Sequence, residues 1–157
     1  MKQKKGFTLI ELLIVIAIIG IVAAIAIPNL LTALQKGKQK ATMGDMRTIG
    51  LAVDSYATDN QMAPGMGTIT QVVGLNQYLV PFHTKILPQK DGWGGDMQYQ
   101  SGGAATKELY SVISYGRDGL DTGINVANNG YIVSTMAGFN NDICYSNGNF
   151  TYGPKVK

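Results

Sequence analysis

The longest apolar run of this 157-residue chain lies close to its start. Between Phe7 and Ile27 the chain has 21 residues, of which only Thr8 and Glu11 are polar. At about 1.5 Å of rise per residue, such a segment forms a helix of roughly 32 Å, which is close to the hydrocarbon thickness of a bilayer. We therefore predict a transmembrane or filament-core helix over residues 7–28.

The helical pattern continues beyond this apolar run. Apolar side chains recur every three or four positions and so share one stripe, while charged side chains take the other faces. The stripe comprises Leu30, Leu34, Met43, Met46, Ile49, Val53 and Tyr56. We expect residues 29–60 to form the amphipathic second half of one long helix, which packs on a sheet.

The remaining residues, 61–157, are predicted to form a globular head with an antiparallel sheet. Two Asn-Gly pairs, Asn129-Gly130 and Asn147-Gly148, indicate tight hairpin turns. Alternation and β-branching predict strands over residues 97–100, 109–115, 124–126, 131–133, 143–145 and 150–152, after one short helix at residues 68–78. The predicted fold class is α+β, with a long N-terminal helix on a small antiparallel sheet.

The position of the expected cleavage site distinguishes this segment from a secretory signal peptide. A signal peptide carries its cleavage site after the apolar core, whereas here the only break lies before it, at Gly6 and Phe7. Residues 1–6 therefore form a leader, and cleavage after Gly6 leaves the apolar helix on the mature protein. Lys2, Lys4 and Lys5 should keep the N-terminus in the cytoplasm.

Glu11 is the one charged residue within the apolar run. An ionised carboxylate in a membrane helix costs about 2.5–3.5 kcal/mol on insertion scales, so it needs a partner or a favourable depth. One interpretation places Glu11 at headgroup level, where the helix dipole favours a negative charge. The interpretation we favour pairs it with the free amine that cleavage creates on Phe7, in the same chain or in a neighbour.

The segment KKGFTLIELLIVIAIIGIVAAIAIPNL resembles the N-terminus of the type IV pilin-like superfamily, which includes type IV pilins and the pseudopilins of type II secretion. The resemblance implies that a prepilin peptidase cuts between Gly6 and Phe7 and N-methylates Phe7. It also implies that Glu11 is required for methylation and subunit docking. Pro28 falls where such helices kink or locally unwind, consistent with its missing N–H.

Three motifs in the C-terminal half refine this resemblance. DGWGGDMQYQSGG, ELYSVISYGRDG and NNDICYSNGNF follow one another from residue 91 to residue 150. They resemble, in the same order, motifs of the major pseudopilins of type II secretion, the general secretion pathway protein G family. The resemblance covers most of the chain, with a looser match over residues 62–85.

The chain has a single cysteine, Cys144, so it cannot form the intrachain disulfide that many type IV pilins contain. In the pseudopilins that this chain resembles, one Ca²⁺ ion in the loop between the last strands takes the place of that disulfide. The resemblance implies a calcium site with Asp118 and Asp142 as ligands, and with Asp121 and Asn141 as further candidates. These oxygen donors suit calcium, although the same residue types are also common in ordinary turns.

Charge and composition argue against other classes of function. Lys2, Lys4 and Lys5 account for the whole formal net charge of +3, so the chain without its leader is neutral, and no basic patch interleaved with aromatics indicates nucleic acid. His83 is the only histidine, and no recognisable nucleophile, phosphate loop or metal cluster accompanies it. We expect no catalytic residues and no enzyme activity.

The sequence thus predicts a filament subunit of a periplasmic type II secretion pseudopilus. The resemblance implies a homopolymer that is processed by prepilin peptidase and assembled by an inner-membrane platform and ATPase, together with minor pseudopilins. Before assembly the subunit would be a single-pass protein of the bacterial inner membrane, and afterwards part of a periplasmic or cell-surface filament.

Two alternatives share part of this evidence. A type IV pilus subunit, used in adhesion or twitching motility, has the same N-terminal features, but the absent disulfide and the C-terminal motifs disfavour it. A membrane-anchored binding module that never polymerises would need neither an acidic residue in its membrane helix nor a peptidase junction.

Overall fold

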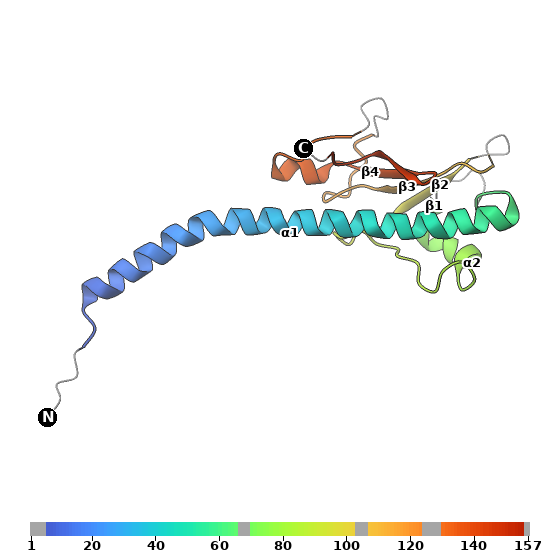
Figure 1. Ribbon diagram of the computed structural model, residues 1–157. Coiled ribbons are helices and arrows are strands. Elements are labelled where there is room, and N and C mark those ends of the chain that lie inside the picture. The colour runs from blue at the N-terminus through green and yellow to red at the C-terminus, as the bar shows by residue number, and fades with distance from the viewer. Residues whose placement is uncertain (1–5, 66–69, 103–106, 124–129, 156–157) are drawn as a thin grey trace. The chain divides into compact units, whose positions relative to one another are not determined.

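A computed structural model shows one long helix and a head domain (Figure 1). It describes residues 6–65, 70–102, 107–123 and 130–155. The chain divides into two compact units, Met1–Lys36 and Gly37–Lys157. Helix α1, Leu9–Asn60, contributes to both units and ends where the sequence predicted.

The first unit contains the apolar part of α1, whose large side chains are exposed. Among the described residues, α1 is the one helix that is long and apolar enough to cross a membrane. The helix is continuous through Pro28, so the local unwinding expected there is absent. Two side chains bond backbone carbonyls around the proline: Asn29 Nδ2 donates to Ile25 O at 3.2 Å and Thr32 Oγ1 to Pro28 O at 3.0 Å.

The second unit holds a five-stranded antiparallel sheet in the order β1-β2-β3-β4-β5. Figure 1 shows this sheet along the C-terminal part of α1. Its elements are β1 (Thr70–Gln71), the 3₁₀ helix η1 (Val72–Leu75), α2 (Asn76–Leu79), β2 (Gln98–Ser101), β3 (Tyr110–Ser114), the 3₁₀ helix η3 (Met136–Asn140), β4 (Ile143–Ser146) and β5 (Asn149–Tyr152). The α+β fold class is confirmed.

Two predicted elements of the head are wrong. The single helix predicted over residues 68–78 is replaced by β1, η1 and α2, because the backbone of residues 70–71 pairs with β2; residues 68 and 69 lie outside the described part. Residues 131–133 form no strand. Tyr131 instead bonds the C-terminal segment, with its N–H donating to Gly153 O at 3.0 Å. Its predicted hairpin partner, residues 124–129, lies outside the described residues.

The hairpin predicted at Asn147-Gly148 is confirmed between β4 and β5. Asn147 and Gly148 have φ angles of 45° and 85°, which is the conformation that favours Asn-Gly in tight hairpin turns. The side chain of Asn147 also accepts a hydrogen bond from Tyr110 N at 2.9 Å. Cys144 on β4 is a buried free cysteine, as expected.

The core lies between α1 and the inner face of the sheet. Met46, Ile49 and Val53 of the predicted helix stripe are completely buried there. At Gly50 a Cβ atom would lie 2.2 Å from Cε1 of Tyr145 on β4, so only glycine lets the helix approach the sheet this closely. Helix packing thus requires a glycine that propensity alone would disfavour.

Candidate functional site

The expected cleavage site lies just before α1. Gly6 and Phe7 are in neither helix nor strand, and both are exposed, with Phe7 at 79%. Exposed backbone that is not held in a helix or strand is the kind of segment that proteases reach most easily. The local structure is therefore compatible with cutting at this junction.

Glu11 has a local partner that the sequence interpretation missed. Thr8 N and Thr8 Oγ1 donate to Glu11 Oε2 at 2.8 and 2.6 Å, and Glu11 N donates to Thr8 Oγ1 at 3.3 Å. This reciprocal pattern is a capping box, whose Thr-x-x-Glu signature is visible in the sequence. Glu11 Oε1 takes no part in these bonds and has no donor among the described residues.

The capping box gives a direct prediction. Thr8→Ala should weaken the first turn of α1 by about 1 kcal/mol, because the cap oxygen and the hydroxyl donor are both lost, whereas Thr8→Ser keeps them. The measurement is amide hydrogen exchange over residues 9–12 of the full chain in detergent micelles. Exchange should be faster in the alanine variant than in the serine variant, and equal rates would contradict the cap.

The predicted calcium ligands lie in the loop after β3 and directly before β4. Asp142 directly precedes β4 and its side chain is completely buried. Asp142 Oδ2 accepts a hydrogen bond from Thr122 N at 3.2 Å, while Oδ1 has no partner among the described residues. A buried carboxylate oxygen without a donor is costly, so this atom indicates a missing partner.

Asp118 and Asp121 are exposed in the loop after β3, where Asp118 Oδ1 accepts from Leu120 N at 3.2 Å and Asp121 Oδ1 from Gly123 N at 2.9 Å. Burial raises the pKa of Asp142; the Thr122 hydrogen bonds oppose this, and the charges of Asp121 and Asp118 raise the pKa further. Burial also raises the pKa of Tyr115, and the charges of Asp121 and Asp142 add to it. The fold thus places Asp118 and Asp121 near enough to Asp142 for their charges to act on it. We call Asp118, Asp121 and Asp142 the acidic loop.

The fourth candidate, Asn141, uses its side chain differently. Asn141 Nδ2 donates to Gly138 O at 3.2 Å and so holds the end of η3. Its neighbour Asn140, which the sequence interpretation missed, has a buried Oδ1 without a partner among the described residues. No sequence signal distinguishes Asn140 from the other turn residues around it.

Backbone oxygens gather next to the acidic loop. A Cβ atom on Gly116 would lie 2.7–2.9 Å from the carbonyl oxygens of Phe139, Asn140 and Asn141. Gly116 has φ +67°, a conformation that favours glycine. Within the described ranges no three His, Cys, Asp or Glu side chains already form a metal-binding group. Any cation held here would therefore need amide or carbonyl oxygens as well as carboxylates.

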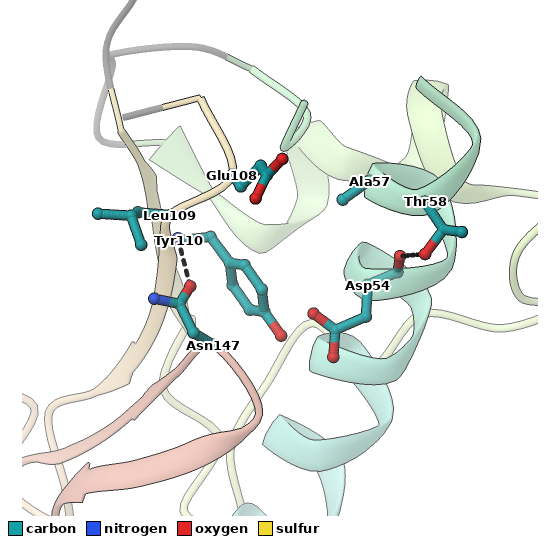
Figure 2. Close-up of a pocket in the computed structure, with 7 residues that line it drawn as sticks. All are labelled: Asp54, Ala57, Thr58, Glu108, Leu109, Tyr110 and Asn147. Atoms are coloured by element: carbon teal, nitrogen blue, oxygen red, sulfur yellow. Dashed lines mark hydrogen bonds between the residues drawn. The ribbon is translucent and has the colours of Figure 1, made fainter. Parts of the chain in front are cut away.

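A separate groove of about 450 Å³ lies between α1 and the end of the sheet (Figure 2). Its lining residues are Asp54, Ala57, Thr58, Glu108, Leu109, Tyr110 and Asn147. Tyr110 Oη donates to Gly50 O at 3.1 Å, and burial, then Asp54, raise the pKa of Tyr110. None of these seven residues is a histidine or cysteine.

The single histidine does not form a catalytic arrangement either. His83 is partly buried, with Nδ1 at 3.1 Å from Ser55 Oγ and 3.9 Å from Asp59 Oδ2. A serine–histidine–aspartate triad needs the serine and the aspartate on opposite ring nitrogens. Here both oxygens face the same nitrogen, so the histidine attaches the loop of residues 80–86 to α1.

Comparisons with known proteins agree with this layout. Residues 1–27 match the family model of the prokaryotic N-terminal methylation motif, and residues 29–133 match that of type II secretion system protein G. No solved structure gives a significant match.

Several curated relatives carry the name type II secretion system core protein G. The relative from Vibrio cholerae serotype O1 is 35% identical, covering 78% of this chain and 87% of its own length. Those from Dickeya chrysanthemi and Pseudomonas aeruginosa are each 32% identical, covering 81% and 78% of this chain and 87% and 89% of their own lengths. The chain therefore belongs to the type II secretion system protein G family.

Proposed function

We propose that this subunit polymerises into a periplasmic pseudopilus through its N-terminal helix after prepilin peptidase has released Phe7. The observation that carries this proposal is the combination of an exposed apolar helix with a Glu11 carboxylate that, among the described residues, uses only one of its oxygens. A platform protein and an ATPase of the inner membrane would drive assembly. Minor pseudopilins would be further partners.

The physical role of Glu11 follows from what drives helices together in lipid. Moving an apolar helix from lipid into a filament core gains little from the hydrophobic effect, because both surroundings are apolar. A charge pair in such surroundings is strongly favoured and also directional. Glu11 Oε1, paired with the free amine of Phe7 on a neighbour, would define the register between subunits. The Thr8 bonds to Oε2 would orient the carboxylate for this pairing.

A deletion experiment distinguishes the pseudopilus from a type IV pilus. Deleting the gene should abolish the appearance of secreted enzymes in the culture medium and leave twitching motility and surface pili unchanged. Complementation with the unaltered gene should restore secretion. Lost motility with normal secretion would instead favour the type IV pilus alternative.

We further propose that the acidic loop binds one Ca²⁺ ion. Asp142 and Asp118 would be side-chain ligands, with Asp121 and the oxygens near Gly116 completing an oxygen-rich site. The unpartnered, buried Asp142 Oδ1 supports this assignment, because a cation would satisfy it. When bound, the ion would neutralise the mutual repulsion of the three carboxylates and cross-link the loop after β3 to β4.

The buried carboxylate predicts opposite effects of one substitution with and without calcium. The pKa of Asp142 is higher in the folded state than in the unfolded state. Ionisation of Asp142 therefore lowers the stability of the folded protein. This cost appears as pH rises from below the unfolded-state pKa through the raised folded-state pKa. Without calcium at pH 7, Asp142→Asn should therefore melt at a higher temperature than the unaltered chain. With calcium it should melt at a lower one.

Thermal unfolding of the full chain in micelles, with EDTA or with Ca²⁺, measures both effects. Asp96→Asn is a suitable control, because Asp96 is an exposed acid paired only with exposed Lys90 at 3.1 Å, and such pairs contribute little. If calcium stabilised the Asp142 variant as much as the unaltered chain, the acidic loop would not be the ion site.

A further inference from the structure

Asp91 occupies a junction between two parts of the head. It opens the Gly-rich turn before β2, and its residue is only 8% exposed. Asp91 Oδ1 accepts hydrogen bonds from Trp93 N and Gly95 N, both at 2.9 Å. Asp91 Oδ2 accepts from Ser114 Oγ on β3 at 2.8 Å. One buried carboxylate therefore holds the turn together and also joins it to the sheet.

The Gly-rich turn that Asp91 holds together is itself docked on α1. Gly92 N donates to Thr42 Oγ1 at 2.9 Å, and Thr42 Oγ1 donates to Lys38 O at 3.0 Å. A Cβ atom at Gly92 would lie 2.4 Å from Lys38 O, so the two backbones are in direct contact. This contact lies at the first turns of the head unit, which begins at Gly37.

On its other side the junction leads to the acidic loop. Ser114 Oγ accepts a hydrogen bond from Gly116 N at 3.3 Å. Gly116 packs against the carbonyls of residues 139–141, and Arg117 N donates to Phe139 O at 2.9 Å. The next residue along that segment is Asp142. A continuous series of contacts therefore connects Asp91 to Asp142.

We propose that Asp91 and Ser114 are positioning residues for the acidic loop, and that they couple ion binding there to docking of the Gly92 turn on α1. This inference rests on the calcium site proposed above. Free-energy coupling between two sites is reciprocal, so an ion that orders the loop should also order the turn. Its consequence for the filament subunit is that ion binding at the acidic loop stiffens the contact between the Gly92 turn and α1.

A purely structural role of Asp91 makes a different prediction. Buried, fully bonded aspartates commonly stabilise a domain without linking two regions, and their loss lowers the melting temperature alone. Coupling instead requires that a change at Ser114 alters hydrogen exchange at particular backbone amides around the acidic loop. Two experiments therefore read individual amides and not only overall stability.

The first experiment uses the full chain in micelles without metal. Ser114→Ala should accelerate hydrogen exchange at Arg117 N and Thr122 N by about tenfold, the effect of losing one buried hydrogen bond to a charged group. Ser111→Ala is the matched control, because Ser111 lies on the same strand, is partly exposed and should leave both amides unchanged. Equal exchange rates in the Ser114 variant and the unaltered chain would overturn the positioning role.

The second experiment adds Ca²⁺. In the unaltered chain calcium should slow exchange at Trp93 N and Gly95 N, and Ser114→Ala or Asp91→Asn should remove this effect and weaken calcium binding by about tenfold in titration calorimetry. Calcium binding with no effect on the turn amides would overturn the coupling. If titration of the unaltered chain with Ca²⁺ gave no heat of binding, both the ion site and the coupling would be overturned. The positioning role would still be tested by the first experiment, which uses no metal.

Discussion

Glu11→Ala should leave the chain inserted in the membrane and abolish filaments. Removing one partner of a charge pair in apolar surroundings costs about 3–5 kcal/mol, which is enough to prevent each subunit from docking. The same change removes the cap acceptor for Thr8. The measurement is the amount of the protein in sheared filaments, compared with its amount in the membrane fraction.

Glu11→Gln separates the two roles of this side chain. Glutamine keeps an oxygen that accepts from Thr8, as the observed capping box requires, but it has no charge for a neighbour's amine. We expect Glu11→Gln to fail in assembly almost as completely as Glu11→Ala, and Thr8→Ala to fail only partly. Normal filaments from the glutamine variant would mean that capping, and not charge pairing, is what assembly requires.

Gly92→Ala should destabilise the head by about 2–3 kcal/mol or more, because the added Cβ would lie 2.4 Å from Lys38 O. Both atoms belong to backbones that Gly92 N and Thr42 already hold together. Relief therefore requires breaking that contact. Urea unfolding can be followed by the fluorescence of Trp93, the only tryptophan of the chain, which lies in the same turn.

Gly44→Ala is a control of opposite sign. Gly44 lies on α1 two residues after Thr42, but it has open space around its Cβ position. Alanine should stabilise the helix there by up to about 1 kcal/mol. If both variants unfolded at the same urea concentration, docking of the turn on α1 would make no contribution to stability.

Sequence patterns predicted most of the elements because those elements depend on local chemistry. The long helix through Asn60 and the Asn147-Gly148 hairpin are encoded by periodicity and by residues with special backbone preferences. Predictions were poorer where long-range pairing competes with local preference. Residues 70–71 form a strand only because β2 is beside them, and Tyr131 pairs with residue 153 rather than with its own neighbours.

The candidate sites divide in the same way. The sequence by itself determined the membrane-length helix and predicts the cleavage junction, because each depends on residues within a few positions of one another. The capping signature around Glu11 is equally local, but it was recognised only in the structure. Only the tertiary structure decided that Asp142 meets a loop 20 residues away and that Asp91 meets Ser114 across 23. Carboxylates in turns look alike in a sequence, and only folding determines which of their oxygens are buried and left without a donor.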